Sequence, residues 1–334
     1  MAESRLVDGH GRVHRDLRIS LTDHCNLRCT YCMPAEGVAW LPREGLLTPA
    51  ELMRIVRVGV GLGLDEVRLT GGEPLLRPDV VEIVARIAAL QTPSGAHPEV
   101  SMTTNGIGLA RLAEPLLDAG LTRVNVSLDT LRPDRFLALT RRDRLDDVLA
   151  GVDAAASAGL SPIKVNALLM RGVNDDEAVD LVRWAVAAGH ELRFIEHMPL
   201  DAGHTWRRDE MITGAEILAR LGEAFTLTPL AGRGAAPAER WLVDDGPGSV
   251  GVIASVTMPF CGDCDRLRLT ADGQLRNCLF AREESDLRTP LRAGASDDEL
   301  AEIFVTCLAG KLPGHGINEP GFLQPRRPMS AIGG

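Results

Sequence analysis

Short runs of alternating hydrophobic and polar residues recur through the first two thirds of the chain, and stretches with helical periodicity separate them. The alternation predicts strands at residues 16–22, 66–70, 99–105, 123–129, 162–170 and 191–198. Between them, residues 48–63 and 145–159 are amphipathic, with proline at the front or glycine at the back, as helix ends prefer. Six β/α units in sequence predict a parallel sheet, either open or closed into a complete or partial barrel.

The two faces of these strands differ in character. One face is apolar, with Leu17, Ile19, Val67, Leu69, Val124, Val126 and Val165. The other face is polar, with Arg18, Arg68, Thr103, Asn125, Ser127, Asp129, Lys164 and Asn166. A sheet with one solvated face is the alternative, but crossover helices cover the faces of parallel sheets. Because an ordinary (β/α)8 barrel fills its interior with aliphatic residues, the polar face favours an open barrel whose lumen holds a polar, anionic ligand.

After residue 200 the pattern changes. Residues 213–225 are helical, 231–240 form a flexible connector, and 266–278 form a hairpin with Asp272-Gly273 at its turn. A further helix is expected at 297–308. We therefore expect an α/β protein with two domains: a partial barrel of (β/α)6 type at 1–230, and a smaller α+β domain at 231–334.

Composition narrows the function classes. The chain has 334 residues, of which 45% are hydrophobic and 25% charged, as in ordinary globular proteins. No apolar run is long enough for a membrane span and no signal-peptide core follows Met1, so we expect a cytoplasmic protein. The net charge of −10 argues against general affinity for nucleic acid or anionic membranes. An anionic ligand must therefore be held by a local cluster of cations.

Six of the seven cysteines fall into two groups of three. Cys25, Cys29 and Cys32 have the spacing C-x3-C-x2-C, whereas Cys261, Cys264 and Cys278 have C-x2-C-x13-C. In a reducing cytoplasm such clusters indicate metal rather than disulfides. Three thiolates can hold three irons of a [4Fe–4S] cluster and leave the fourth iron open. The alternative at both sites is zinc. At the first site His24 would be the fourth ligand, although C-x3-C-x2-C is not a usual zinc spacing. At the second site the fourth ligand would come from elsewhere in the chain. Cys307 lies in an apolar helical stretch and reads as a core residue.

These motifs resemble a known family. The first trio, with an aromatic residue before its last cysteine and a strand before it, is similar to the signature of radical S-adenosylmethionine (SAM) enzymes. "TGGEPLL" (70–76), after the second strand, is similar to their glycine-rich segment, where the backbone closely approaches the cofactor. Segments 18–34 and 260–280 and the terminal "IGG" resemble one branch, the GTP-cyclising enzymes of molybdenum cofactor biosynthesis. The resemblance covers nearly the whole chain.

The resemblance implies two [4Fe–4S] clusters, the first held by Cys25, Cys29 and Cys32 and the second by Cys261, Cys264 and Cys278. SAM would bind the open iron of the first cluster and yield a 5′-deoxyadenosyl radical, and the positions that match its contacts are Tyr31, Gly72, Ser127 and Met198. GTP would bind the open iron of the second cluster through its guanine, and the matching contacts are Arg18, Arg68, Thr103, Lys164, Arg266, Leu267 and Arg268. The catalytic set that it implies is Cys25, Cys29, Cys32, Arg266, Arg268, Gly333 and Gly334.

Purely structural explanations of several of these residues remain as alternatives. Tyr31 and Met198 fit plain core positions, and Arg266 and Arg268 fit a solvated hairpin face. Arg193 is a weaker substrate candidate that an internal ion pair would explain equally well. The two terminal glycines, by composition alone, indicate a frayed end, whereas the resemblance implies a tail that reaches into the active-site cavity.

The resemblance also implies partners and a product. The radical would take hydrogen from C3′ of GTP, and C3′ would then bond to C8, giving (8S)-3′,8-cyclo-7,8-dihydroguanosine 5′-triphosphate. An unidentified electron donor would act before this step, and cyclic pyranopterin monophosphate synthase would act after it. A homodimer is a further possibility. Three rival functions are a radical SAM peptide modifier, a zinc-binding scaffold without activity, and a barrel enzyme acting on a phosphorylated metabolite.

Overall fold

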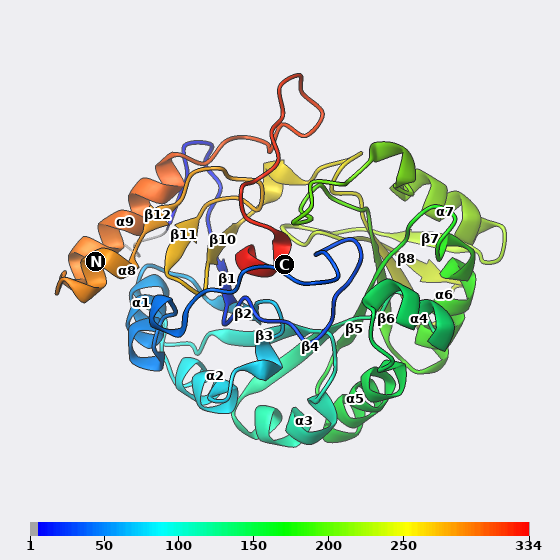
Figure 1. Cartoon of the computed structure of the whole chain (residues 1–334), viewed down its shortest axis with the longest axis horizontal. Coiled ribbons are helices and arrows are strands. Elements are labelled where there is room, and N and C mark those ends of the chain that lie inside the picture. Colours follow the sequence, from blue (N-terminus) through cyan, green and yellow to red (C-terminus); the bar gives the residue numbers. More distant parts are fainter. Residues whose placement is uncertain (1–5, 334) are drawn as a thin grey trace.

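The structure, a computed structural model, describes residues 6–333. Its centre is a row of six parallel strands: β1 (Asp16–Ser20), β2 (Glu66–Thr70), β3 (Glu99–Thr104), β4 (Leu121–Ser127), β5 (Ile163–Leu168) and β6 (Glu191–Ile195). The helices between and after them are α1 (Pro49–Gly61), α2 (Val80–Ala88), α3 (Leu109–Asp118), α4 (Pro133–Thr140), α5 (Leu145–Ala158), α6 (Ala178–Ala187) and α7 (Gly214–Gly222). Figure 1 shows these helices on the outside of the curved sheet. The predicted partial barrel is confirmed.

The alternation along the strands places the two faces as the sequence predicts. Leu17, Ile19, Val67 and Leu69 are 0% exposed and belong to the core. The helix after β1 begins at a local signal: Thr48 caps the N-terminus of α1 in a reciprocal pair with Glu51. Burial of the aliphatic face under the helices leaves the polar face to line the barrel interior.

The later part of the chain extends both edges of the same sheet. Its strands are β7 (Leu227–Leu230), β8 (Glu239–Val243), β9 (Ser249–Ile253), β10 (Arg266–Leu269), β11 (Gln274–Arg276) and β12 (Ser285–Asp286). β9 pairs in parallel with β6, and β10 pairs in parallel with β1. The remaining helices are α8 (Arg288–Arg292), α9 (Asp297–Ala309) and α10 (Met329–Ile332). The division of the chain at residue 230 stays a prediction.

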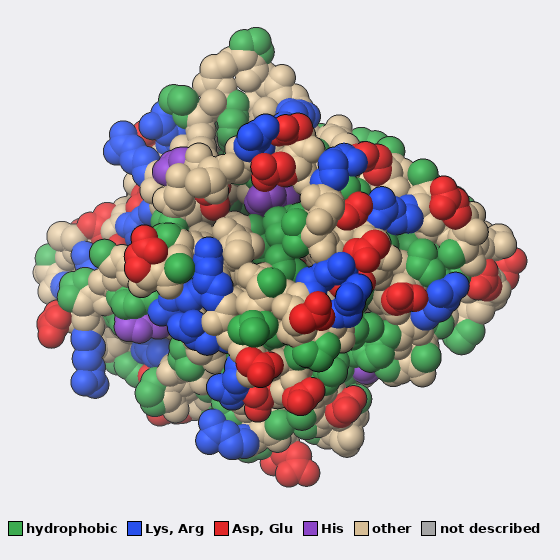
Figure 2. All heavy atoms as spheres, turned by 45° about the vertical axis from the view of Figure 1, so that its right-hand side comes forward, with side chains coloured by type: hydrophobic (Ala, Val, Ile, Leu, Met, Phe, Trp, Pro, Cys, Tyr) green, Lys and Arg blue, Asp and Glu red, His purple; other side chains and the backbone are tan. Residues whose placement is uncertain are grey.

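Two further features bear on the site. The C-terminal segment, red in Figure 1, returns from the periphery to the middle of the barrel. On the face drawn in Figure 2, acidic and basic side chains are interspersed over the surface. Within residues 6–333, no helix is long and apolar enough to cross a membrane.

Candidate active site

The first cysteine trio lies in the loop that follows β1. Cys25, Cys29 and Cys32 all line a cavity of about 310 Å³ inside the barrel. The backbone of this loop is ordered by hydrogen bonds, among them one from the Cys32 N–H to the Cys29 carbonyl at 3.0 Å. Asn105 Nδ2 lies 3.8 Å from Cys25 Sγ, at the end of β3. The chain thus presents three sulfur donors to one side of the cavity.

The surroundings of this trio oppose free thiolates. Burial raises the pKa of Cys25 to about 11 and that of Cys32 to about 12. Burial and the nearby carboxylate of Asp129 raise the pKa of Cys29 well above its ordinary value. The three thiols are therefore protonated at neutral pH, and binding of a metal cluster must release their protons. Three soft donors in an apolar pocket, next to an open cavity, fit an iron–sulfur cluster.

The glycines of the "TGGEP" segment have a different structural reason from the one expected. A Cβ on Gly72 would lie 2.3 Å from the His24 carbonyl oxygen and 2.4 Å from that of Asp23. The Gly72 N–H donates to the Thr22 carbonyl at 2.7 Å, and the Glu73 N–H donates to that of His24 at 2.8 Å. Glycine is thus required here to admit the backbone that leads into the cysteine loop. Contact of Gly72 with a cofactor stays a prediction, although this residue does line the cavity.

Tyr31, Ser127 and Met198 line the same cavity as the cysteines. The Tyr31 hydroxyl donates to Asp129 Oδ2 at 2.6 Å, and Asp129 Oδ1 accepts from the Leu168 N–H at 2.8 Å. Burial raises the pKa of Asp129 to about 6. Tyr31 therefore lies on the cavity wall with its hydroxyl held by Asp129, and its contact with a cofactor stays a prediction.

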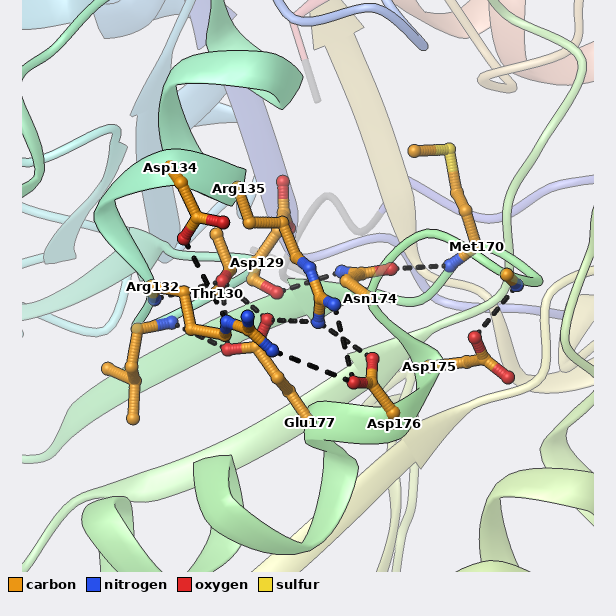
Figure 3. Close-up of polar contacts among 12 residues, drawn as sticks. Asp129, Thr130, Arg132, Asp134, Arg135, Met170, Asn174, Asp175, Asp176 and Glu177 are labelled. Atoms are coloured by element: carbon orange, nitrogen blue, oxygen red, sulfur yellow. Dashed lines mark hydrogen bonds and ion pairs between the residues drawn. The ribbon is translucent and has the colours of Figure 1, made fainter.

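The loop after β4 that carries Asp129 is braced by polar contacts with the segment before α6 (Figure 3). Asn174 Nδ2 donates to the Asp129 carbonyl at 2.8 Å. Thr130 Oγ1 donates to Glu177, and Arg135 pairs with Glu177 at 2.5 Å. Because Glu177 and Asn174 come from the segment before α6, this network fixes the β4 and β5 ends relative to each other. The backbone that carries Asp129 is held in place by this network.

A second cavity, of about 660 Å³, opens beside the first and is lined largely by cations. Its basic residues are Arg12, Arg15, Arg18, Arg68, Arg123, Lys164, Arg193, Arg233 and Arg266, against the acidic residues Asp16, Glu66, Asp263 and Asp265. Arg18, Arg68, Arg193 and Arg266 line both cavities. The cationic lumen predicted from strand alternation is therefore present.

Strand register creates the densest part of this cation cluster. Arg18 of β1 lies opposite Arg68 of β2 on one side and Arg268 of β10 on the other. Burial and the neighbouring guanidinium of Arg266 lower the pKa of Arg268 to about 10. Asp16 is the nearest counter-charge, with its Oδ2 3.4 Å from Arg18 and 3.5 Å from Arg266. One carboxylate cannot balance these guanidiniums, so the site favours an added anion.

Lys164 and Arg193 extend the cluster across β5 and β6. Burial, together with the charge of Arg193, lowers the pKa of Lys164 to about 8. Arg193 pairs with Glu191 at 2.5 Å and at the same time lines both cavities. The ion pair that the sequence left open is real, and it does not remove Arg193 from the cavity wall.

The β10 candidates separate by strand parity. Arg266 and Arg268 are 7% and 5% exposed, so the interpretation of a solvated hairpin face is wrong. Leu267 points the other way and is 0% exposed in the core. Any contact of Leu267 with substrate can therefore involve only its backbone. Thr103 lines the first cavity beside Asn125.

The second cysteine trio lines a third cavity, of about 170 Å³. The β10–β11 turn brings Cys278 to the side of Cys261 and Cys264, as the hairpin pattern predicts. Phe260 and Leu279, chain neighbours of two of these cysteines, line the central cavity. The trio thus lies just behind the wall of the cavity that carries the first trio.

Lys311 distinguishes this second site from the first. Its Nζ lies 3.6 Å from Cys264 Sγ and donates to the Arg266 carbonyl at 2.8 Å. Burial alone would raise the pKa of Cys264, but the charges of Lys311 and Arg266 outweigh it and lower that pKa. Three thiol donors beside buried cations again suit a thiolate-bound cluster. In the chain from 6 to 333, no three His, Cys, Asp or Glu side chains gather closely enough to hold one metal ion.

The C-terminal tail enters the interior of the barrel. Gly333 is buried, and its carbonyl accepts from Arg268 Nη1 at 2.7 Å. It adopts a φ of +83°, and a Cβ there would lie 2.4 Å from Thr70 Oγ1. Glycine is required at this position by both conformation and space. Gly334 lies outside the described residues.

Sequence reasoning missed several residues of the site. Arg123 shares the inward face of β4 with Asn125, so strand alternation contained the signal. Arg12 and Arg233 come from loops, where no periodicity indicates direction. The chain has 34 arginines and only two lysines, one of which is Lys311. This rarity was the only signal in the sequence that could have pointed to Lys311.

Comparison with known proteins identifies the family. The profile of the Radical SAM superfamily matches residues 19–185, and the profile named Molybdenum Cofactor Synthesis C matches residues 190–317. A GTP 3′,8-cyclase of Streptomyces coelicolor is 61% identical over 98% of this chain and 96% of its own length. A GTP 3′,8-cyclase of Corynebacterium glutamicum is 56% identical over 98% of this chain and 89% of its own.

Among solved structures, SuiB of Streptococcus suis bound to S-adenosylmethionine superposes with a TM-score of 0.59. It covers 88% of this chain and 69% of its own at 13% identity, so this likeness shows the fold alone. The fold, the two profiles and the full-length relatives agree. The chain belongs to the radical SAM superfamily and, within it, to the family whose curated members are named GTP 3′,8-cyclase.

Proposed function

We propose that this chain converts GTP into (8S)-3′,8-cyclo-7,8-dihydroguanosine 5′-triphosphate, the first step of molybdenum cofactor biosynthesis. The observation that carries this assignment is the arrangement of three adjoining cavities. The first cysteine trio lines the central cavity, the second trio lines a separate cavity just behind its wall, and buried guanidiniums line the central cavity and the cavity beside it. A nucleoside triphosphate is an anion that such a space can hold between two redox groups.

The two trios are the proposed cluster ligands. Cys25, Cys29 and Cys32 would hold a [4Fe–4S] cluster that binds SAM, and Cys261, Cys264 and Cys278 would hold a second one facing the guanine. When bound and reduced, the first cluster and SAM supply a 5′-deoxyadenosyl radical for hydrogen abstraction at C3′. Three cysteines at each site leave one iron of each cluster free for a small-molecule ligand.

The chain itself contributes position and charge. Tyr31, held by Asp129, and Ser127 and Met198 form the wall against which the adenosyl group would lie. Arg18, Arg68, Arg266 and Arg268 would grip the triphosphate with paired N–H donors, while Lys164 acts as a point charge. The buried walls exclude water, which would otherwise weaken each of these contacts.

Removal of single cations should impair substrate use far more than cofactor cleavage. We expect Arg18→Ala, Arg68→Ala and Lys164→Ala each to weaken GTP binding about tenfold to a hundredfold, since a charge-assisted hydrogen bond contributes roughly 1.5–3 kcal/mol. Titration calorimetry of GTP, with SAM as matched control ligand, measures this. Unchanged GTP affinity in all three variants would mean that these side chains do not meet the triphosphate.

The depressed pKa of Lys164 predicts a pH dependence. Below its pKa of about 8 the ammonium is charged and attracts phosphate, whereas above it the free chain has lost this charge. Bound triphosphate raises that pKa again, so binding takes up a proton at alkaline pH. GTP affinity should then fall between about pH 7 and about pH 9, by up to about tenfold per pH unit. Lys164→Met is the control for titration of guanine itself, and an equal slope in this variant would exclude Lys164 as the cause.

Partners follow from the proposed reaction. GTP and SAM are the small molecules bound, an electron donor that the sequence does not identify reduces the first cluster, and cyclic pyranopterin monophosphate synthase takes the product. We place the reaction in the cytoplasm, where both substrates are made, and a homodimer is compatible with it.

The experiment that tests this function uses anaerobically reconstituted chain. With GTP, SAM and dithionite, the account expects the 3′,8-cyclised nucleotide, identified by mass and by the C3′–C8 bond in its NMR spectrum. About eight irons per chain should accompany activity, four for each cluster. A chain with full iron content that cleaves SAM but leaves GTP unchanged would contradict the proposal.

A further inference from the structure

The C-terminal tail is fastened at its base by an ion-pair cluster that none of the reaction chemistry uses. Arg327 Nη1 donates to Asp272 Oδ1 at 3.0 Å, and its Nη2 donates to Asp272 Oδ2 at 2.9 Å. The Nε of the same guanidinium donates to Glu284 Oε2 at 3.1 Å. The Arg327 guanidinium thereby donates three hydrogen bonds to two carboxylates.

The partners of Arg327 are themselves fixed. The side chains of Asp272 and Glu284 are only 9% and 19% exposed. Asp272 Oδ1 also accepts from the Thr270 hydroxyl at 2.6 Å, and Glu284 pairs with the buried Arg276 of β11. Bidentate pairs with partly desolvated, rigid carboxylates are much stronger than mobile surface ion pairs.

The cluster belongs to the hairpin that also holds the far end of the tail. Asp272 lies in the β10–β11 turn, and Arg268 of β10 donates to the Gly333 carbonyl inside the barrel. Between these two attachments lies α10, whose Met329 N–H donates to the Leu200 carbonyl at 2.9 Å. A single hairpin thus sets both ends of the segment that enters the cavity.

We infer that Arg327 is a positioning residue, which through Asp272 and Glu284 fixes where the tail lies in the cavity. Arg327 lines neither the central nor the cationic cavity, and in the proposed function on which this inference rests it does not touch substrate. Its effect on turnover must therefore pass through the tail beyond it, whose Met329 and Ser330 line the central cavity and whose Gly333 is held by Arg268. Arginine is specifically required, because the fork of a guanidinium reaches both carboxylates at once and an ammonium does not.

The chain offers a matched control one residue away. Arg326 is exposed, and its side chain makes no hydrogen bond or ion pair within residues 6–333. Arg326→Ala removes the same charge from the same segment without opening the cluster. Arg327→Lys retains the charge but loses the fork, and it serves where Arg327→Ala fails to fold, as judged by thermal melting.

The first measurement does not depend on activity. Hydrogen exchange of residues 328–333, followed by mass spectrometry on the full reconstituted chain, should be faster in Arg327→Ala and Arg327→Lys and unchanged in Arg326→Ala. Exchange at wild-type rates in both Arg327 variants would overturn the inference, even if the chain proved to have no cyclase activity.

The second measurement is a double-mutant cycle on GTP affinity, measured by titration calorimetry, which can still be read where conversion is nearly abolished. We expect Arg327→Ala to weaken GTP binding at least about tenfold while SAM cleavage persists, since it removes a charge-assisted anchor. In a chain that already lacks Gly333 and Gly334, the same substitution should add a much smaller loss of affinity, because the end of the tail that it positions is gone. Equal losses in the two backgrounds would show that Arg327 supports the fold in general and would overturn the positioning role.

Discussion

Replacement of Cys25, Cys29 and Cys32 by alanine should abolish SAM cleavage and remove about half of the iron from the reconstituted chain. These cysteines lie together on one wall of the central cavity, in a loop whose backbone is fixed by the "TGGEP" segment. Burial disfavours a free thiolate at Cys25 and Cys32, so a bound cluster would have to stabilise the deprotonated sulfurs. Iron and sulfide analysis together with detection of 5′-deoxyadenosine measures the two effects.

The matched control is the second trio. Replacement of Cys261, Cys264 and Cys278 should also remove half of the iron, but it should spare SAM cleavage and stop GTP conversion. The two sites line separate cavities, so their losses should be independent. If anaerobically prepared protein carries zinc at either trio, the assignment of that trio is wrong.

Deletion of Gly333 and Gly334 should leave folding, both clusters and SAM cleavage intact while nearly eliminating GTP conversion. Gly333 lies in the interior, in a conformation and a space that admit no side chain, and Arg268 holds its carbonyl. Arg268 is one of the cations proposed to meet the triphosphate, so the tail and the substrate share a partner. Loss of the two tail glycines should therefore disturb the GTP site and not the cofactor site.

The control for this deletion is Gly333→Ala, which keeps the length of the tail. A Cβ at this position would meet Thr70 Oγ1, so this variant should also lose GTP conversion. Circular dichroism and iron content verify that the barrel and clusters persist. Full conversion by the truncated chain would return the tail to the frayed-end interpretation.

Strand alternation predicted the barrel well because each β/α unit is a local pattern. β2 spans the same residues, 66–70, as the strand predicted from alternation, and the inward direction of Arg18, Arg68 and Lys164 follows from their positions in the alternating pattern. The helix starts at Pro49 and Asp297 were equally visible, since capping signals act within a few residues. Local physics sufficed for these elements.

Long-range pairing was not visible in the same way. Nothing in the residues of β10 indicates that it lies beside β1, yet this pairing places Arg268 next to Arg18. The reason for Gly72 depends on the path of residues 22–24, which the sequence does not show. Lys311 reaches Cys264 only because the chain after α9 folds back onto β10. Such contacts are set by the tertiary fold and could not be read from spacing.

The most direct test of the central claim follows one hydrogen atom. GTP deuterated at C3′ is incubated anaerobically with the reconstituted chain, SAM and dithionite, and the 5′-deoxyadenosine formed is analysed by mass spectrometry. The account predicts that this 5′-deoxyadenosine carries deuterium and that the nucleotide product has lost it. Unlabelled 5′-deoxyadenosine, produced while the cyclised nucleotide accumulates, would contradict hydrogen abstraction at C3′ and with it the proposed reaction.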